Sequence, residues 1–439
     1  MMKPVNVGLL GIGTVGGGVY AVLLRNAEEI ARRAGRSIRI SVVADKNLDA
    51  AKKITSGQCR ITNDAFSVVN DPDVDVVVEL IGGYTVAKDL VLQAIANGKH
   101  VVTANKALLA VHGTEIFRAA SDKGVMVGFE AAVAGGIPII KALREGLTAN
   151  RIQMVAGIIN GTTNFILSEM RDKGLPFATV LAEAQRLGYA EADPTFDIEG
   201  IDAAHKITLL SAIAFGIPVQ FDKAHIEGIT ELDAKDIRYA EQLGYRIKLL
   251  GISKRQSKGI ELRVHPTLVP AKRLLASVEG AMNAVVVQGD AVGTTLYYGK
   301  GAGAEPTASA VIADLLDVSR LQEADETHRV PHLAFQSNTI SDALPVLDFD
   351  ETQAGNYLRL RVQDKPGVLA NITRILADHS ISIDAMLQKE PDEGEGDTDL
   401  VILTHVCKES DLLSAVKNIE SLPTILGKVT RLRLEEFQS

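Results

Sequence analysis

Cysteine is scarce in this chain of 439 residues, which contains only Cys59 and Cys407. The two lie far apart, in segments that we assign to different domains, so they supply no disulfide framework and indicate a reducing compartment. The chain also lacks any apolar run that approaches the ~20 residues of a membrane helix. Its first residues, Met1–Pro4, lead into a predicted strand without the apolar core of a signal peptide, so we expect a cytoplasmic protein.

Clusters of lysine and arginine are missing as well, and the formal net charge is −9. Because nucleic-acid phosphates are bound by grouped basic side chains, the sequence argues against a nucleic-acid-binding surface. Transition-metal motifs are also missing: His328 and His332 are four residues apart, but Pro331 prevents a helix there and no third ligand is near. The length predicts two or three domains, and a hydrophobic fraction of 46% is typical of a soluble globular protein.

A glycine-rich loop near the N-terminus is the first candidate site. Val5–Leu10 is typical of a buried parallel strand, and it is followed, at the start of a predicted helix, by Gly11, Ile12, Gly13, Thr14, Val15 and Gly16. In this G-x-G-x-x-G pattern the first glycine permits a tight turn, the second lets a pyrophosphate approach the backbone, and the third lets the helix pack on its strand. The flanking strand and helix therefore predict an α/β dinucleotide-binding domain of the Rossmann type over residues 1–138.

The choice between NAD and NADP depends on the end of the second predicted strand, Ile38–Ala44, which is followed by Asp45 and Lys46. Asp45 would hydrogen-bond a ribose 2′-hydroxyl and favour NAD, whereas Lys46 would pair with a 2′-phosphate and favour NADP. These residues leave both cofactors open.

Further candidates follow later strands of the same predicted sheet. Thr103 ends one strand, and Lys106 lies just past its carboxyl end, where open parallel sheets bind ligands, although a lone lysine is more often a surface residue. A strand predicted over Val125–Glu130 leads into the small residues 131–138. Their backbone could turn its carbonyls onto a hard cation or a substrate, and a plain hinge into the next domain is an equally good interpretation.

The most informative stretch is Tyr189–Lys206, which gathers five carboxylates and one lysine in an otherwise apolar neighbourhood. Pro194 prevents a helix from running through it, and a helix is predicted to begin directly after Gly200. Asp202 and Lys206 then lie on one helical face. On a solvated helix such a pair is worth roughly 0.3–0.5 kcal/mol. Here the apolar neighbours predict that the pair faces a cleft, where the lysine can exchange a proton with a substrate oxygen.

Residues 139–302 are predicted to form an α+β catalytic and dimerisation domain with an open mixed sheet. The turn Asn160–Asn164 precedes a helix in this domain, and its threonines either cap that helix or line the cleft. A second glycine-rich loop, Gly299–Thr307, suits an anion or a nicotinamide ribose. The helix after it, within 303–320, is expected to return to the first domain.

The C-terminal part begins with the polar, irregular residues 321–355, which predict a linker. Residues 356–435 then follow a self-contained β-α-β-β-α-β pattern with an acidic loop at 391–399, which predicts a small ferredoxin-like domain. A domain of this size with an exposed sheet edge favours pairing with a second copy, so we expect a homodimer or homotetramer.

Taken together, these segments resemble homoserine dehydrogenases of the monofunctional bacterial type that carry a C-terminal ACT domain. The resemblance covers nearly the whole chain, and its most specific motifs are Gly11–Gly16, Thr103–Lys106, Asn160–Asn164 and Tyr189–Lys206. It implies reversible hydride transfer between L-aspartate 4-semialdehyde and L-homoserine with NAD(P)H, on the route to threonine, methionine and isoleucine. The residues alone also allow another aldehyde or amino-acid dehydrogenase on the same scaffold, or a non-catalytic amino-acid sensor.

The resemblance further implies roles for individual side chains. Lys206 would donate a proton to the aldehyde oxygen as the hydride arrives. Glu191 and Asp202 would hold the substrate with support from Asp197. Lys106 would be the second lysine of the cleft, close to cofactor and substrate.

A sodium ion is also implied, held by backbone oxygens of Val133, Gly135 and Ile137 with help from Glu130. Gly303 would lie beside the cofactor.

Two further expectations concern regulation and cofactor preference. The turn Asp364–Gly367 resembles the effector turn of ACT domains, with Asn371 one helical turn on, so an amino acid is the expected effector, and L-threonine in particular. Ala44 stands where relatives often have an arginine that holds the NADP phosphate. Together with Asp45, this favours NAD or dual use.

Overall fold

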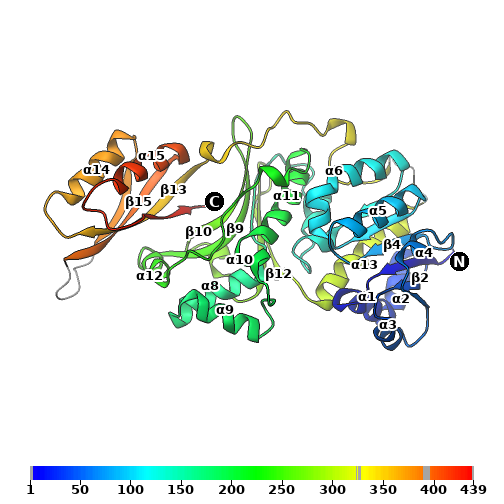
Figure 1. Cartoon of the computed structure of the whole chain (residues 1–439). Coiled ribbons are helices and arrows are strands. Elements are labelled where there is room, and N and C mark those ends of the chain that lie inside the picture. Colours follow the sequence, from blue (N-terminus) through cyan, green and yellow to red (C-terminus); the bar gives the residue numbers. More distant parts are fainter. Residues whose placement is uncertain (1–2, 323, 325–327, 389–395, 438–439) are drawn as a thin grey trace.

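The computed structural model describes residues 3–322, 324, 328–388 and 396–437, which form three domains in a row (Figure 1). The N-terminal domain lies at one end, the C-terminal domain at the other, and the middle domain joins them. None of the described helices is long and apolar enough to cross a membrane. Most of the expected acidic loop at 391–399 falls outside the described residues.

The N-terminal domain contains a parallel sheet with the strand order β3-β2-β1-β4-β5-β6, which confirms the predicted Rossmann-type fold. Its central strands are buried along their whole length, as expected where helices cover both faces. The strands are β1 (Val5–Leu10), β2 (Ile38–Ala44), β3 (Arg60–Thr62), β4 (Val76–Glu79), β5 (His100–Thr103) and β6 (Val127–Gly128). The helices are α1 (Thr14–Arg25), α2 (Ala27–Ala34), α3 (Leu48–Thr55), α4 (Ala65–Val69), α5 (Thr85–Ala96) and α6 (Lys106–Lys123).

Helix α13 (Ala304–Leu321) follows the middle domain in sequence but packs on the N-terminal domain, against α1. Gly18 of α1 permits this approach, since a β-carbon there would lie 2.5 Å from the carbonyl oxygen of Ala304. Val311 and Leu315 share a buried cluster with strand β1. The start of α13, directly after the second glycine-rich loop, therefore lies against the helix that follows the first.

The middle and C-terminal domains share one ten-stranded sheet within the described residues, in the order β12-β11-β7-β9-β10-β16-β13-β15-β14, with β8 beside β10. Antiparallel pairs and two parallel pairs make it mixed, as predicted. The middle domain supplies strands β7 (Ile152–Ile158), β8 (His225–Ile226), β9 (Tyr245–Arg255), β10 (Ile260–Pro270), β11 (Met282–Gly289) and β12 (Gly293–Lys300). Its helices are α8 (Gly161–Lys173), α9 (Phe177–Arg186), α10 (Thr195–Ile198), α11 (Ile201–Phe215) and α12 (Ala234–Gln242), and α11 packs on β7, β9 and β10.

The C-terminal domain has the predicted β-α-β-β-α-β order. Its elements are β13 (Gln353–Gln363), α14 (Val368–Asp378), β14 (Ile383–Gln388), β15 (Asp397–Lys408), α15 (Glu409–Glu420) and β16 (Thr430–Leu434). The expectation that this domain is self-contained is wrong, because β16 pairs in parallel with β10, with Thr267 opposite Arg433 and Leu268 opposite Leu434. Residue alternation reports which face of a strand is buried, and it does not identify the partner at an edge.

The segments between these elements include 3₁₀ turns and one π-helical turn. The strand predicted over Val125–Glu130 is shorter than expected, since β6 ends at Gly128 and a 3₁₀ turn, Glu130–Ala132, follows. The chain then enters the middle domain through α7 (Ile139–Lys141), which continues as a π-helical turn, Ala142–Gly146. Further 3₁₀ turns lie at Phe221–Lys223, Leu274–Ser277, Ser337–Thr339 and Phe349–Glu351.

Candidate active site

The first glycine-rich loop has the backbone geometry that its sequence predicts. Gly11 has a φ of 89°, and a β-carbon there would lie 2.8 Å from the carbonyl oxygen of Leu80. A β-carbon on Gly16 would lie 2.1 Å from the carbonyl oxygen of Gly11, whereas one on Gly13 would meet nothing within 4 Å. The space beside Gly13 is therefore open at the N-terminus of α1, where no side chain caps the helix and an anion can bind.

Asp45 lies directly after β2 and faces this loop. Its carboxylate accepts hydrogen bonds from the backbone N–H of Ile12 at 2.8 Å and from that of Asn47 at 2.8 Å. These bonds hold the carboxylate against the glycine-rich loop, at the position from which ribose hydroxyls are bound in this fold. Lys46 is exposed. The geometry thus brings Asp45, rather than Lys46, into contact with the loop.

The carboxyl ends of β4 and β5 are joined through Glu79, a residue that sequence reasoning missed. Glu79 is fully buried and accepts hydrogen bonds from the N–H groups of Ile81 and Gly82. It also accepts one from the hydroxyl of Thr103 at 2.7 Å, and that hydroxyl accepts from Asn105 N–H. The hydroxyl of Thr103, an expected cofactor residue, is thus used to shape this edge of the sheet. The sequence signal for Glu79 was a glutamate at the end of a buried strand, shortly before Gly82 and Gly83.

Three charged groups meet where the N-terminal and middle domains adjoin. Lys106 is the first residue of α6, while Asp202 and Lys206 lie on α11, as the i, i+4 spacing predicts. The Asp202 carboxylate lies 2.6 Å from Nζ of Lys206 and 3.1 Å from Nζ of Lys106. Nζ of Lys206 also donates to the carbonyl oxygen of Ile159 at 2.7 Å. One buried carboxylate therefore holds two lysines that come from different domains.

Asn160 is a second organiser of this cluster. Its side-chain oxygen accepts from Thr163 N–H and caps α8, so the expectation that a threonine caps this helix is wrong. Its amide nitrogen donates to Asp197 at 2.7 Å and to Asp202 at 2.8 Å. Thr162 donates its hydroxyl to the carbonyl oxygen of Tyr189. An asparagine before a helical pattern was the signal for this cap.

Glu191 lies in the exposed segment between α9 and α10. Gln185 of α9 donates to its carbonyl oxygen at 3.1 Å, which leaves the carboxylate available to a ligand. Asp202, Asp197 and Glu191 all raise the pKa of Lys106, with Asp202 the largest influence. The expected substrate carboxylates therefore surround Lys106 closely enough to interact with its charge.

Burial and charge set the pKa values of the cluster. Burial would raise the pKa of Asp202, but the charges of Lys206 and Lys106 and hydrogen bonds from Lys206 and Asn160 outweigh it and hold that pKa well below its usual range. Burial lowers the pKa of Lys206, and the charge of Lys106 lowers it further, whereas Asp202 raises it. Burial raises the pKa of Asp197. A buried lysine with a lowered pKa gives up its proton more readily than an exposed lysine, which suits it to proton exchange with a substrate.

The small-residue bend after β6 forms a separate candidate site. Ala134 and Gly135 have φ values of 55° and 47°, and a β-carbon on Gly135 would lie 2.5 Å from the carbonyl oxygen of Gly301 in the second glycine-rich loop. Glu130 is buried, and its carboxylate accepts from the N–H groups of Ile140 and Lys141. Burial, together with the charge of nearby Asp314, raises the pKa of Glu130 to about 8.

A hard monovalent cation fits this bend better than a transition metal does. No group of three or more His, Cys, Asp or Glu side chains able to hold a metal ion occurs among the described residues. The buried carboxyl groups of Glu130 and Asp314 lie beside a backbone that turns at Ala134 and Gly135, and a bound cation would favour their charged forms. Carboxylate and carbonyl oxygens are ligands of hard cations. Gly303, with a φ of 128°, follows at the start of α13.

Comparisons with known proteins agree along the whole chain. The family model "Homoserine dehydrogenase, NAD binding domain" matches residues 11–130, "Homoserine dehydrogenase" matches 138–316, and "ACT domain" matches 356–424. Homoserine dehydrogenases of Pseudomonas aeruginosa and Neisseria gonorrhoeae are each 59% identical over 436 residues, covering 99% of this chain and 100% of the relative.

Solved structures give the same result. A crystal structure of a homoserine dehydrogenase from Thiobacillus denitrificans superimposes with a TM-score of 0.95 at 66% sequence identity, covering 100% of this chain and 99% of that one. A hyperthermophilic archaeal homoserine dehydrogenase in complex with NADPH matches 74% of this chain and 99% of its own, with a TM-score of 0.63 and 26% identity.

Proposed function

The chain belongs to the homoserine dehydrogenase family, a family of oxidoreductases, and we propose that Lys206, Asp202 and Lys106 carry its reaction. The reaction is the interconversion of L-homoserine and L-aspartate 4-semialdehyde, on the route to threonine, methionine and isoleucine. The observation that carries this assignment is the placement of Asp202, which contacts lysines from both domains at their junction.

Lys206 is the proton donor for aldehyde reduction and the acceptor for alcohol oxidation. Its ammonium group is buried and already oriented by Asp202 and by the carbonyl oxygen of Ile159. Because its pKa is lowered by burial, it gives up its proton more readily than an exposed lysine. As the substrate carbonyl carbon gains a hydride, the developing negative charge on oxygen would be quenched by this proton.

The substrate is held by the acids and the second lysine around this donor. The α-ammonium of the substrate suits the carboxylates of Glu191 and Asp202, and Asp197 supports them through the amide of Asn160. Lys106 has a side chain that is 37% exposed, so a ligand bound between the two domains could contact it. Fixing the substrate between two domains orients its reacting carbon and excludes water.

The first glycine-rich loop would hold a nicotinamide cofactor, which would supply or accept the hydride when bound. The diphosphate would be cradled by Gly11, Ile12, Gly13, Thr14, Val15 and Gly16, and Thr103 and Gly303 would lie beside the cofactor. The contact of Asp45 with the loop supports a bond to the ribose 2′-hydroxyl and hence the use of NAD. Exposed Lys46 leaves room for a 2′-phosphate, so dual use with NADP is part of the proposal.

A sodium ion is proposed for the bend after β6. The backbone oxygens of Val133, Gly135 and Ile137 would hold it, and Glu130 would balance its charge. Such an ion would stabilise the connection between the cofactor and substrate domains. The two residues with positive φ and the buried carboxylates support this site.

Regulation is proposed for the C-terminal ACT domain, with an amino acid, L-threonine, binding at the turn Asp364–Gly367 near Asn371. The continuous sheet formed by β10 and β16 supports a mechanical link from this domain to the catalytic one. Pairing of exposed sheet edges supports a homodimer or homotetramer. Free Cys59 and Cys407 agree with action in the reducing cytoplasm.

The test follows absorbance of the reduced nicotinamide while the purified protein oxidises L-homoserine, with NAD and NADP in parallel and with or without L-threonine. Turnover supports the reaction, the ratio of kcat/KM values decides the cofactor, and inhibition by threonine supports the regulatory role. A protein that binds cofactor but oxidises L-homoserine with neither NAD nor NADP would instead be a sensor. Turnover of another aldehyde alone would indicate another dehydrogenase on this scaffold.

A further inference from the structure

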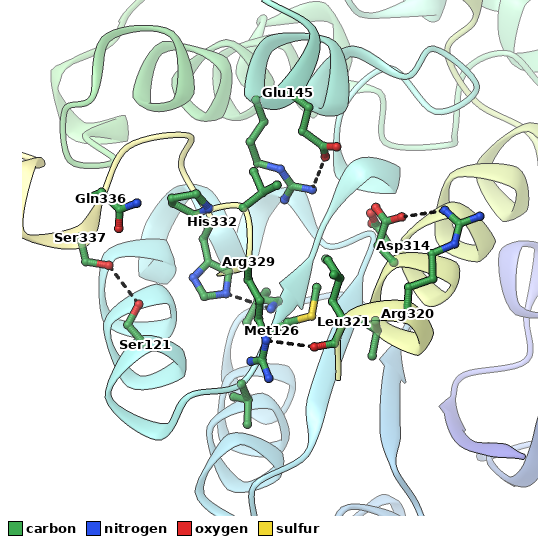
Figure 2. A pocket seen from close by; sticks show the side chains of 18 residues that line it. Ser121, Met126, Glu145, Asp314, Arg320, Leu321, Arg329, His332, Gln336 and Ser337 are labelled. Atoms are coloured by element: carbon green, nitrogen blue, oxygen red, sulfur yellow. Dashed lines mark hydrogen bonds and ion pairs between the residues drawn. The ribbon is translucent and has the colours of Figure 1, made fainter. Parts of the chain in front are cut away.

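A cavity of about 240 Å³ lies away from the candidate active site, between the edge strand β6, the C-terminal half of α13 and the linker (Figure 2). The linker covers it through three contacts. His332 accepts the N–H of Val127 at 3.1 Å, Arg329 donates to the carbonyl oxygens of Gly124 and Leu321, and Ser337 bonds to Ser121. The segment that leads to the C-terminal domain therefore forms one wall of the cavity.

Most charged groups around this cavity already have partners. Arg329 donates to three backbone carbonyls, and Arg320 donates to the carbonyl oxygen of Arg33. Asp314 accepts the N–H of Glu130, and Asp317 pairs with Lys141. These groups line the cavity, and each of them already has a partner in the protein for its charge or its hydrogen bonds.

Arg144 differs from these groups. Its side chain is more than nine-tenths buried, yet its Nε is buried without a hydrogen-bond partner. Burial raises the pKa of Asp314 to about 6 and lowers that of His332 to about 4, and the charge of Arg144 opposes the first shift and adds to the second. The guanidinium therefore lies close to both lining residues. A buried guanidinium N–H without a partner costs free energy, so the hydrogen-bonding capacity of Arg144 is not fully used among the described residues.

The backbone that carries Arg144 is unusual as well. Residues Ala142–Gly146 form a π-helical turn, in which Leu147 N–H donates to the carbonyl oxygen of Ala142 at 2.9 Å. Such turns are rare and occur frequently at functional sites, because the extra residue redirects side chains. Here the turn places Arg144 and its neighbour Glu145 together at the cavity.

Glu145 supplies the opposite charge. Its carboxylate accepts only from Arg144, at 3.1 Å, among the described residues, and its side chain is 40% exposed. An adjacent cation and anion match the adjacent carboxylate and ammonium of an α-amino acid. The remaining wall is largely apolar, with Val125, Met126, Val318, Leu321 and Val330 among the lining side chains.

We propose that this cavity is a binding site for a small aliphatic α-amino acid, with Arg144 binding its carboxylate and Glu145 its ammonium group. The volume of about 240 Å³ is below the roughly 300–1,000 Å³ of pockets for drug-sized ligands, so the ligand is small. The site is distinct from the candidate active site and from the expected effector turn at Asp364–Gly367, and it rests on neither of them.

The test is isothermal titration calorimetry on the full chain with L-valine, with 3-methylbutanoate, which lacks the ammonium, and with isobutylamine, which lacks the carboxylate. The wild type should bind L-valine, and both truncated probes should bind at least about tenfold more weakly. R144Q should weaken L-valine binding at least about tenfold. Because R144Q changes a buried residue, E145Q provides a second test at a half-exposed one, and it should abolish the preference for L-valine over 3-methylbutanoate.

Two controls separate this site from others. R238Q removes an exposed arginine of α12, and N371A alters the expected effector turn. Both should bind L-valine as the wild type does. Absent binding by the wild type, unchanged binding by R144Q, equal affinity for 3-methylbutanoate, or loss of binding in N371A would each overturn the proposal.

Discussion

Asp202 of the middle domain and Lys106 of the cofactor domain form an ion pair across the domain junction, with 3.1 Å between carboxylate oxygen and Nζ. The same carboxylate holds Lys206 at 2.6 Å. Any relative movement of the two domains that separates α6 from α11 would break the first contact and leave the second. The pair thus makes the geometry of the proposed proton donor depend on how the domains are positioned, and a substrate that binds between them would act on both.

Replacing Lys206 by alanine should lower turnover by about 10²–10⁴-fold, the usual contribution of a positioned acid or base. Cofactor affinity should stay within about twofold, because Lys206 lies on α11 and the dinucleotide loop lies on the other domain. Steady-state kinetics and titration of NADH fluorescence would measure the two effects. K235A, at a lysine near the start of α12, is the matched control. Wild-type turnover in K206A would remove Lys206 from the mechanism.

Replacing Asp202 by asparagine should change the pH dependence of aldehyde reduction. Asp202 raises the pKa of Lys206 and opposes the effect of burial, so its loss should lower that pKa further. The proton donor would then be lost at a lower pH, and the alkaline limb of the kcat profile should move to lower pH. Asparagine keeps the shape and can still accept from Lys206. A profile that keeps its wild-type position would show that this charge does not control the donor.

The sequence predicted part of this site because its signals are local. Spacing alone placed Asp202 and Lys206 on one helical face, and the G-x-G-x-x-G loop fixed a turn whose geometry follows from three glycines. Glu79 was missed, and the turn that begins at Asn160 was identified without the role of its side chain. Both roles come from partners brought together by the fold, such as Thr103 and Asp197.

The same limit applies to the fold. Hydrophobic alternation and turn residues predicted the order of elements in the C-terminal domain and the strand, loop and helix at the start of the N-terminal domain. The pairing of β16 with β10, and the linker contact between His332 and Val127, join residues more than 150 positions apart. No local sequence pattern identifies these partners. A strand edge offers only backbone groups for pairing, and the linker offers only backbone groups and isolated polar side chains.

Cofactor preference should respond to the two residues after β2 in opposite directions. D45N weakens the acceptor for a ribose 2′-hydroxyl and removes a charge that repels a 2′-phosphate, so kcat/KM should fall about tenfold for NAD and rise for NADP. K46A should lower kcat/KM for NADP and leave NAD nearly unchanged. Steady-state kinetics of each variant with NAD and with NADP would measure the two kcat/KM values and their ratio. If D45N affected both cofactors equally, the bond from Ile12 N–H would be its main role.

The stability of the protein should fall as pH rises toward 8, in part because of Glu130. Its pKa is raised from 4.5 to about 8 in the folded state, chiefly by burial, so the folded protein holds a proton there that the unfolded chain releases. Stability from this group is complete below about pH 4.5 and is lost as pH rises to about 8. The Tm of E130Q, in which the charge cannot form, should therefore decline less over this range than that of the wild type.

The proposed sodium ion should also affect the pH dependence of stability through Glu130. An ion bound beside Glu130 would favour the charged carboxylate, so replacing choline chloride by sodium chloride at equal ionic strength should raise Tm at pH 8 more than at pH 5. E130Q should lose most of this difference. An equal effect of sodium in both proteins at both pH values would argue against the proposed ion.

Arg433 should be the most sensitive position at the junction of the catalytic and ACT domains. It is buried on β16 and pairs with Glu409 at 2.7 Å and with Glu227 of the middle domain. R433M leaves these two carboxylates without their shared partner, so the free energy of unfolding should fall by about 3–5 kcal/mol. R431Q is the matched control: Arg431 lies two residues away on the same strand face and is partly exposed, so its contact with Glu409 should be worth about 1 kcal/mol or less. Urea denaturation of the three proteins measures the difference. Equal losses in the two variants would mean that the contact with Glu227 adds little to the connection between the domains.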